Sequence, residues 1–179
     1  MKKTSENFGE EYLFFKTALG WVGIVAAEKG LRALFLEGAR DRVLEALLRE
    51  HPSACPGEGF SLREGQRQVL EYLAGERRLF RIDIDCGPLS PFRRAVYGEL
   101  LRIPYGETVS YGELAARLGR PGAARAVGQA LAANPLPLVV PCHRVVGAGG
   151  ALTGFSGGEG IATKMKLLDM EGARPRKWF

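Results

Sequence analysis

Residues 110–133, SYGELAARLGRPGAARAVGQALAA, carry the clearest local fold signal in the chain. Ser110 and Glu113 form a capping box, in which each side chain hydrogen-bonds to the backbone N–H of the other at the start of a helix. A tight turn at residues 119–122 separates that helix from a second one at 123–133, which is rich in alanine and glycine. Two short helices joined by a glycine-containing turn predict a helix-turn-helix.

This pattern leaves two interpretations open. In a DNA-binding helix-turn-helix, small side chains let the second helix approach DNA closely, and the N-terminal residues of that helix make the contacts. Arg125 occupies such a position. The alternative is an ordinary helical hairpin whose alanines pack against the rest of the protein. The net charge of +5 is compatible with a polyanionic partner, although many basic proteins bind no nucleic acid.

The N-terminal half is predicted to be β-rich and then helical. Its β-prone runs are separated by glycine-containing turns, which indicates a hairpin or meander, and they occupy residues 12–17, 22–28 and 31–36. Apolar residues at helical spacing predict one helix from a cap at Asp41 to Glu50 and another from a cap at Ser61 to Gly75. Alternation of apolar and charged residues at 79–84 predicts a half-exposed strand.

Residues 85–90 combine glycine and proline, and the pattern changes after them, so they are the best candidate for a linker. The 179 residues are enough for two small domains. We therefore expect a two-domain α/β (α+β) fold. Residues 1–88 would form an N-terminal α/β domain with a small β-sheet and helices, and residues 89–179 a mostly helical C-terminal domain with the helix-turn-helix.

Chemically, the most distinctive stretch is Pro141-Cys142-His143-Arg144. A cysteine reacts as its thiolate, and its free pKa of about 8.5 falls when a base or cation lies close. Here His143 supplies the base and Arg144 the cation. The alternative is a buried structural cysteine at the end of a strand, because free cysteine is among the most buried residue types. The glycine-rich segment at 147–160 lacks the ending of a phosphate-binding loop, so we expect a flexible lid or pocket rim beside the thiol.

Composition narrows the class of protein. The chain is 46% hydrophobic and 25% charged, which is typical of a soluble globular protein. Three cysteines without paired spacing favour a reducing compartment, and Lys16 interrupts the apolar N-terminal segment that a signal peptide would need. We therefore expect a cytoplasmic protein without a membrane span. With two histidines and no Cys-x-x-Cys, no metal site is predicted; His51 and Cys55 are only a weak candidate.

Residues 103–158 resemble, nearly without a break, the O6-alkylguanine-DNA alkyltransferases, also called methylated-DNA–protein-cysteine methyltransferases. Several separate motifs carry the resemblance in the right order: IPYGETVSYGELA at 103–115, ARAVG at 124–128, NP at 134–135, PCHRV at 141–145 and GFSGG at 154–158. The N-terminal half matches only in length and in its order of strands followed by helices.

This resemblance implies direct DNA repair. The alkyl group of O6-alkylguanine in double-stranded DNA, with O4-alkylthymine as a further candidate, would be transferred irreversibly and stoichiometrically to Cys142. A thiolate suits displacement at carbon because it is a soft nucleophile. The base would have to be flipped out of the duplex first. The protein would act as a monomer, with no cofactor, metal or membrane.

Four residues are implied for the catalytic set. Cys142 would accept the alkyl group, and His143 would act as the base through a water molecule. Glu171 would orient His143, completing a Cys-His-Glu relay. Asn134 would brace the turn that precedes the active-site strand.

Other residues are implied for DNA and base binding. Arg125 would fill the gap that the flipped nucleotide leaves, and Tyr111 would donate toward the guanine or press on the adjacent phosphate. Phe155 stands where the family often has tyrosine, so the aromatic wall remains without its hydroxyl. The remaining implied residues are Ala124, Ala126 and Gly128 on the DNA-binding helix and Val145, Ser156 and Gly157 in the substrate pocket, together with Phe155.

Three alternatives compete with this interpretation. A noncatalytic binder of alkyl lesions would have the same fold, but relatives of that kind replace the reactive cysteine. A helix-turn-helix regulator would explain the charge and Arg125 but gives Cys142 and His143 no role. A cysteine hydrolase could use Cys142, His143 and Glu171, yet no oxyanion-hole motif is evident, and adjacent side chains diverge on a strand.

Overall fold

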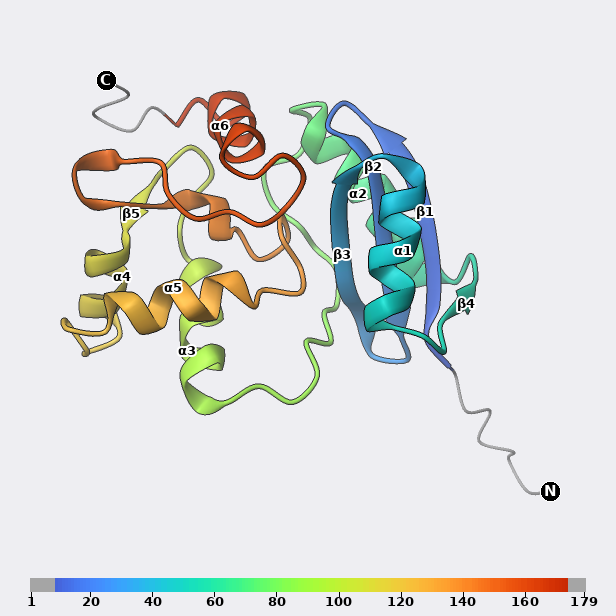
Figure 1. The fold of residues 1–179 in the computed structure, drawn as a ribbon, viewed down its shortest axis with the longest axis horizontal. Coiled ribbons are helices and arrows are strands. Elements are labelled where there is room, and N and C mark those ends of the chain that lie inside the picture. The colour runs from blue at the N-terminus through green and yellow to red at the C-terminus, as the bar shows by residue number, and fades with distance from the viewer. Residues whose placement is uncertain (1–8, 174–179) are drawn as a thin grey trace.

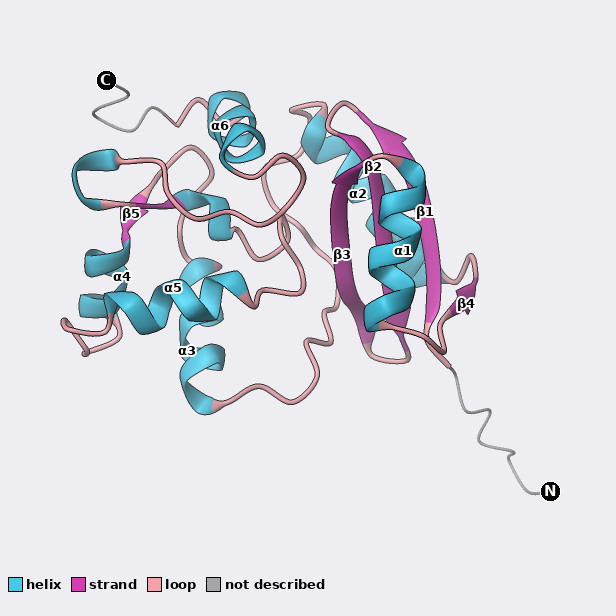
Figure 2. Cartoon of the chain, viewed as in Figure 1, coloured by secondary structure: helices cyan, strands magenta, loops and turns pink. Residues whose placement is uncertain are grey.

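Residues 9–173, the part of the chain that the computed structural model describes, form a β-rich N-terminal half and a mostly helical C-terminal half (Figure 1). The colouring by secondary structure shows the sheet with its two helices in the first half and mainly helices and loops in the second (Figure 2). The expected mixed fold with a small sheet and a helical C-terminal half is therefore confirmed.

The sheet belongs to the N-terminal half. Its strands are β1 (Glu11–Thr17), β2 (Gly20–Ala27), β3 (Gly30–Gly38) and β4 (Cys55–Pro56). The first three form an antiparallel meander, as predicted, and β4 adds a short parallel strand beside β1, giving the order β3-β2-β1-β4. Gly20 and Gly30 start β2 and β3 with φ of +99° and +133°, in the region that glycine adopts readily. These two glycines allow the tight connections.

Opposite faces of the sheet are covered by one helix each (Figure 1). The helices are α1 (Arg40–Glu50) and α2 (Phe60–Leu73). Successive strand residues point to opposite faces, so Val25 packs in a cluster with Val43 of α1, whereas Ile24 packs in another with Leu62 of α2. The α2 side faces the C-terminal half and is the side on which the larger core forms.

Both helices begin earlier than predicted. The residue before α1 is Ala39 and the residue before α2 is Gly59, and neither start has a side-chain cap. The predicted caps at Asp41 and Ser61 are therefore wrong, because both residues already lie inside the first helical turn. Asp41 still places a negative charge near the positive end of the helix dipole.

The predicted strand at 79–84 is also wrong. Only one bridge forms there, between Leu31 and Ile84, with the N–H of Leu31 donating to the carbonyl of Asp83 over 2.9 Å. Further along, the side chain of Gln68 on α2 takes the place of a neighbouring strand. Its Oε1 accepts from the N–H of Arg81 at 2.7 Å, and its Nε2 donates to the Arg81 carbonyl at 2.8 Å. Backbone groups that a side chain satisfies need no ladder.

Helices and two very short strands make up the C-terminal half. The elements are α3 (Pro91–Leu100), β5 (Val109–Ser110), α4 (Tyr111–Arg117), α5 (Ala124–Ala132), β6 (Val145–Val146) and α6 (Ile161–Met170), with the 3-10 turns η1 (Cys142–Arg144) and η2 (Ala148–Gly150). The helix-turn-helix is confirmed as α4 and α5. Its capping box forms as predicted: the N–H of Glu113 donates to Ser110 Oγ at 3.1 Å, and the N–H of Ser110 donates to Glu113 Oε2 at 2.6 Å.

One continuous apolar cluster joins the two halves. It runs from the α2 side of the sheet, through Tyr72, to buried residues of the C-terminal half such as Leu100 and Val127. Backbone hydrogen bonds reinforce this contact along the outer edge of β3. The N–H of Leu34 donates to the carbonyl of Pro135 at 2.7 Å, and the N–H of Gly158 donates to the carbonyl of Leu36. The edge strand is thereby covered by the half that carries Cys142.

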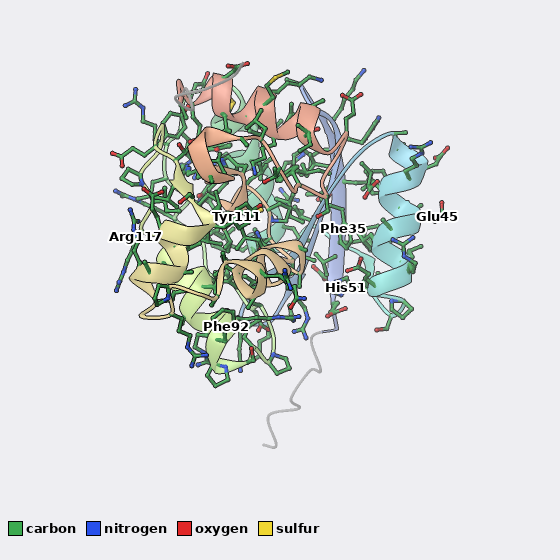
Figure 3. The ribbon with its side chains drawn as sticks, turned by 60° about the vertical axis from the view of Figure 1, so that its left-hand side comes forward. Phe35, Glu45, His51, Phe92, Tyr111 and Arg117 are labelled. Carbon is green, nitrogen blue, oxygen red and sulfur yellow. The ribbon has the colours of Figure 1, made fainter. Side chains whose placement is uncertain are left out.

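His51, half of the weak metal candidate, is engaged otherwise. Its Nδ1 lies 2.8 Å from Glu10 Oε2, and its ring packs edge-on against Phe35 with centroids 6.1 Å apart (Figure 3). Cys55 is exposed. Within residues 9–173, no three His, Cys, Asp or Glu side chains gather as metal ligands would, and no helix is both long and apolar enough to cross a membrane.

Candidate active site

Cys142 lies in the short 3-10 turn η1, which follows α5 by way of a proline-rich segment. The prediction that a strand presents this cysteine is wrong. Pro137 and Pro141 have no N–H to donate to a ladder, and the N–H of Val140 folds back to the carbonyl of Leu136 at 2.8 Å. The strand β6 begins only after the turn.

Asn134 braces the segment that leads to Cys142. Its Nδ2 donates to the carbonyl of Val140 at 2.8 Å, and its Oδ1 accepts from the N–H of Leu136 at 3.1 Å. Between them, Leu138 has φ of +72°, a left-handed conformation that costs energy for a branched residue. The two hydrogen bonds of Asn134 hold the turn in this shape. The C-cap of α5 is Ala133, so Asn134 is not a simple helix cap.

Cys142 is 7% exposed, and it lines a hollow of about 250 Å³. The other lining residues come from α4, α5 and the glycine-rich segment: Tyr111, Gly128, Leu131, Ala132, Gly154, Phe155 and Ser156. Burial raises the pKa of the thiol, although a hydrogen bond from Asn134 and the charge of Lys164 act in the opposite direction. At neutral pH the thiol therefore keeps its proton until a base removes it.

The residue that follows Cys142 is a fully buried histidine, His143. Nε2 of His143 lies 2.8 Å from Glu171 Oε1, whereas Nδ1 has no hydrogen-bond partner among the described residues. An ionised carboxylate only accepts hydrogen bonds, so Nε2 carries the proton and Nδ1 keeps a free lone pair. Burial lowers the pKa of His143 even though Glu171 acts in the opposite direction. The lowered pKa keeps the imidazole neutral. This tautomer is a base whose accepting atom is Nδ1.

Glu171 is buried at the end of α6 and holds several partners together. Arg144 donates from Nη2 to Oε1 at 2.9 Å and from Nε to Oε2 at 3.0 Å, and the N–H of Gly106 donates to Oε2 at 3.0 Å. Burial alone would raise the pKa of Glu171, but the hydrogen bonds from His143 and Arg144 lower it to about 2. The carboxylate is therefore ionised at all ordinary pH values.

Sequence reasoning missed Tyr72, which reaches this group from α2. Its hydroxyl donates to Glu171 Oε1 and lies 3.2 Å from His143 Nε2. Burial and the neighbouring Glu171 raise the pKa of Tyr72, so it remains a donor. A buried tyrosine hydroxyl needs a polar partner, and this is the only signal that the sequence offers. It does not say that the partner lies 99 residues away.

Lys164 on α6 was also missed. Its buried Nζ donates to the carbonyls of Val145 and Thr153, both at 2.6 Å, and to that of Gly154 at 3.4 Å. Burial lowers the pKa of Lys164 to about 8. The sequence does indicate that Lys164 is buried. It lies three and four residues before Leu167 and Leu168, and residues three and four apart share one face of a helix.

The rim of the hollow is formed by Tyr111 and the glycine-rich segment. The Tyr111 hydroxyl donates to the carbonyl of Thr153 at 3.3 Å, and burial raises the pKa of this hydroxyl. Gly128 lies opposite, and a Cβ atom there would be 3.7 Å from the Tyr111 ring. Figure 3 places Tyr111 next to α5. The segment is therefore a pocket rim fastened by hydrogen bonds.

Not every implied residue lies at the hollow. Arg125 is exposed in the first turn of α5, and neither it nor its neighbours Ala124 and Ala126 line it. The side chain of Val145 is fully buried and lines no part of the hollow; its carbonyl instead accepts from Lys164. Gly157 lines a larger neighbouring hollow, between the thiol and β3, that also reaches Cys142.

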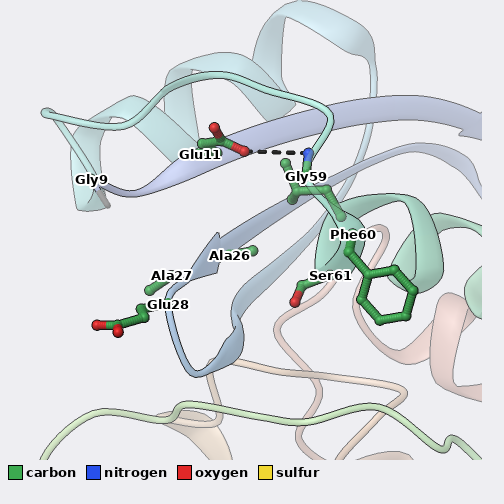
Figure 4. A pocket seen from close by; sticks show the side chains of 9 residues that line it. Gly9, Glu11, Ala26, Ala27, Glu28, Gly59, Phe60 and Ser61 are labelled. Atoms are coloured by element: carbon green, nitrogen blue, oxygen red, sulfur yellow. Dashed lines mark hydrogen bonds between the residues drawn. The ribbon is translucent and has the colours of Figure 1, made fainter. Parts of the chain in front are cut away.

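A separate hollow of about 260 Å³ lies between the start of β1, the end of β2 and the start of α2 (Figure 4). It contains the carboxylates of Glu11 and Glu28, and Glu11 accepts a hydrogen bond from the N–H of Gly59 at 3.3 Å. Its lining holds no cysteine, histidine or basic side chain. The buried thiol and a hollow coincide at Cys142.

Comparison with known proteins identifies the family to which this chain belongs. The family model described as 6-O-methylguanine DNA methyltransferase, DNA binding domain, matches residues 91–173. The methylated-DNA–protein-cysteine methyltransferase of Methanosarcina acetivorans is 39% identical over 163 residues, which cover 90% of this chain and 98% of that protein. The chain belongs to the methylated-DNA–protein-cysteine methyltransferase family. The resemblance that residues 103–158 carry is therefore confirmed.

Other members of the methylated-DNA–protein-cysteine methyltransferases agree. The enzyme of Salmonella typhimurium is 42% identical over 165 residues, covering 87% of this chain and 92% of that protein. The crystal structure of Mycobacterium tuberculosis OGT in complex with DNA superimposes with a TM-score of 0.77 at 40% identity, covering 90% of this chain and 92% of that chain. The similarity thus extends through the N-terminal half.

Proposed function

We propose that this protein repairs DNA directly, by moving the alkyl group of O6-alkylguanine to its own Cys142 in a single irreversible turnover. The observation that carries the proposal is a buried thiol on the wall of a hollow, beside an imidazole whose Nε2 is held by Glu171 and whose Nδ1 is free. The names of the relatives, and the DNA bound to the Mycobacterium tuberculosis protein, support the same substrate.

The reaction begins with proton transfer. Nδ1 of His143 takes the thiol proton of Cys142 through a water molecule, and Glu171 stabilises the imidazolium that forms. The Sγ–C bond then forms while the C–O6 bond breaks, and the bonding electron pair leaves with the guanine. The alkylated thioether is stable, so the protein is consumed one molecule per lesion.

The departing guanine needs a hydrogen-bond donor as negative charge develops on it. Tyr111 supplies one when its hydroxyl turns from the carbonyl of Thr153 to the base, since this hydroxyl stays protonated and sits on the rim of the hollow. The thiol proton is returned from His143 by way of solvent, so that the products are guanine and S-alkyl-Cys142. Phe155 and Ser156 flank the base in the hollow.

DNA approaches along α5. The small residues Ala124, Ala126 and Gly128 bring this helix close to the groove, and Arg125 enters the duplex where the target nucleotide has rotated out. An exposed arginine in the first turn of the second helix suits this role. Extrusion costs a few kcal/mol, which the inserted side chain offsets.

The proposal includes the division of labour within the chain. Residues 1–88 act as a supporting domain and residues 89–179 as the domain that binds DNA and accepts the alkyl group. The protein acts as a monomer in the cytoplasm; its three free cysteines suit a reducing compartment.

Mass spectrometry tests this function directly. After incubation with a duplex containing O6-methylguanine, the peptide that contains Cys142 is expected to gain the mass of one methyl group in place of a hydrogen, about 14 Da by standard atomic masses. The lesion should disappear in equal amount, with no further turnover.

A Cys142→Ser protein and an undamaged duplex are the controls. An unmodified Cys142 peptide with a persisting lesion would contradict the proposal and favour a noncatalytic lesion-binding or regulatory protein. Repeated turnover of a small ester would point to a cysteine hydrolase.

A further inference from the structure

We propose that Tyr72, contributed by the N-terminal half, is a positioning residue for the His143–Glu171 pair. Its hydroxyl sets the direction of the Glu171 carboxylate and so keeps the free Nδ1 of His143 available to the thiol. The inference rests on the proposed function, because it gives the sheet half of the molecule a part in alkyl transfer.

The geometry of Tyr72 carries the proposal. The hydroxyl donates to Glu171 Oε1, which also accepts from His143 Nε2 at 2.8 Å, and it lies 3.2 Å from that nitrogen. Tyr72 is fully buried, with its ring edge-on to Tyr105 at 6.0 Å and tilted against Phe80 at 5.0 Å. A ring enclosed in this way places its hydroxyl at one point only.

Glu171 needs this third direction of support. Arg144 and Gly106 hold the carboxylate from the C-terminal half, Arg144 through both oxygens and Gly106 through Oε2. Tyr72 is the donor to Oε1 that comes from α2. Without it, Oε1 still accepts from Nε2 of His143, but the carboxylate and the imidazole can shift together, so Nδ1 no longer keeps one fixed direction toward the thiol.

The same contact sets the basicity of His143. Tyr72 withdraws part of the negative charge of Glu171, so its removal leaves a stronger acceptor and raises the pKa of His143. The charged and titratable groups around this histidine come from α2, from its own turn, from α6 and from the segment before β5: Tyr72, Cys142, Arg144, Lys164, Glu171 and Tyr105, with Arg78 over the Tyr105 ring. Of these, only Tyr72 and Glu171 hydrogen-bond to His143.

Tyr72→Phe tests the proposal, because it removes the hydroxyl and keeps the ring. The rate constant for alkyl transfer from a duplex with O6-methylguanine should fall about tenfold or more, as it does when a partner that orients a functional histidine is removed in metal sites. The acid limb of its pH profile should move to higher pH, in step with the pKa of His143.

The chain has two histidines, so protein labelled with ¹⁵N-histidine gives NMR signals from His51 and His143 alone. In the wild-type protein, neutral His143 should carry its proton on Nε2. In Tyr72→Phe, its titration should move to higher pH. This measurement needs no DNA.

Tyr105→Phe is the matched control. It also removes a half-buried hydroxyl next to α6, one that donates to the carbonyl of Met170 at 3.2 Å and leaves the carboxylate of Glu171 untouched. Its rate constant and its His143 titration should both match the wild type.

Equal losses in Tyr72→Phe and Tyr105→Phe would reduce Tyr72 to a packing residue and overturn the proposal. So would an unshifted His143 titration in Tyr72→Phe, even with a slower rate. Should that variant not fold, a wild-type His143 protonated on Nδ1 is enough to refute the idea. A wild-type protein that transfers no alkyl group refutes the proposed function instead, and the NMR titration still judges Tyr72.

Discussion

At the scale of single residues, Lys164 joins the two walls of the candidate active site. Its Nζ links the carbonyl of Val145, next to the Cys142 turn, with those of Thr153 and Gly154 on the rim. The three acceptors lie on two segments of the chain, the start of β6 and the glycine-rich rim. Loss of the ammonium would therefore release the rim without unfolding the helix that carries it.

Lys164→Met is expected to slow alkyl transfer at least tenfold while changing the free energy of unfolding at pH 7 by less than about 2 kcal/mol. The stability effect is small because removing a costly buried charge offsets the carbonyls left without a donor. Rate assays and urea unfolding check the two parts. Lys166→Met is the control, since Lys166 is exposed and pairs with Glu159 at 3.2 Å. A Lys164→Met protein with the wild-type rate would contradict this role.

The shifted pKa of Lys164 makes a second, independent prediction. The unfolded chain holds the Lys164 proton up to pH 10.5, but the folded protein releases it near pH 8. Between these values the unfolded state binds more protons, so folding becomes more favourable as pH rises. Compared with Lys164→Met, the wild type should gain up to about 3 kcal/mol across this window. Urea unfolding of both proteins at pH 7 and pH 10 measures the difference.

The sequence alone could predict only some of these residues. Cys142 and His143 are adjacent in a conspicuous motif, and Glu171 follows from the family resemblance. Lys164 and Tyr72 look like an ordinary helix lysine and an ordinary core tyrosine, because what defines them is the identity of a distant partner. Such partners are fixed by tertiary packing, which local patterns do not report.

At the scale of elements, α5 is the candidate contact with DNA. Arg125 projects from its first turn without lining the hollow, so its proposed role concerns the duplex and not the chemistry. This separation can be tested with two substrates, one that must be flipped out and one that is already free.

Arg125→Ala is expected to slow repair of an O6-methylguanine duplex about tenfold or more, equivalent to 1.4 kcal/mol or more of lost support for the flipped state. The reaction with free O6-benzylguanine should be unchanged. Arg42→Ala, which removes an exposed arginine from α1, controls for the lost positive charge. Equal losses of Arg125→Ala on both substrates would argue against a role in flipping.

Elements with their own local signals could be predicted. The meander has β-prone runs between glycine turns, and the start of α4 has reciprocal partners in Ser110 and Glu113. The conformation of residues 79–84 could not be predicted. Their alternation of apolar and charged residues shows only which side chains are exposed, and the side chain of Gln68 bonds to the backbone where a neighbouring strand would. The turn at Cys142 could not either, because its shape depends on Asn134 and on two prolines acting together.

At the scale of the whole molecule, the buried network of Glu171 ties the two halves together electrostatically. The pKa of Glu171 is lowered to about 2 from an ordinary value of 4.5. The unfolded state therefore takes up a proton first as pH falls through this window, and stability is lost there. The pKa of His143 is lowered from 6.5, so its contribution begins to be lost below that pH.

Glu171→Gln should lower the free energy of unfolding by roughly 3–5 kcal/mol at pH 7, because it leaves the buried charge of Arg144 without its partner. That deficit should shrink by about 2 kcal/mol on going from pH 7 to pH 3, as the wild type loses the contribution of its own carboxylate. Glu45→Gln on the exposed side of α1 is the control (Figure 3). A deficit that stays constant with pH would show that the carboxylate charge is not what stabilises the fold.

The covered edge of β3 has a consequence for anyone who divides this chain. The C-terminal half supplies the groups that bond to Leu34 and Leu36, and it completes the apolar cluster on the α2 side. A fragment ending near residue 88 would expose an unpaired strand edge beside an apolar surface. This combination promotes pairing with other chains and aggregation. Split-reporter or fragment-complementation designs based on this scaffold should therefore co-express both pieces, or place polar substitutions along that edge before expressing the first piece alone.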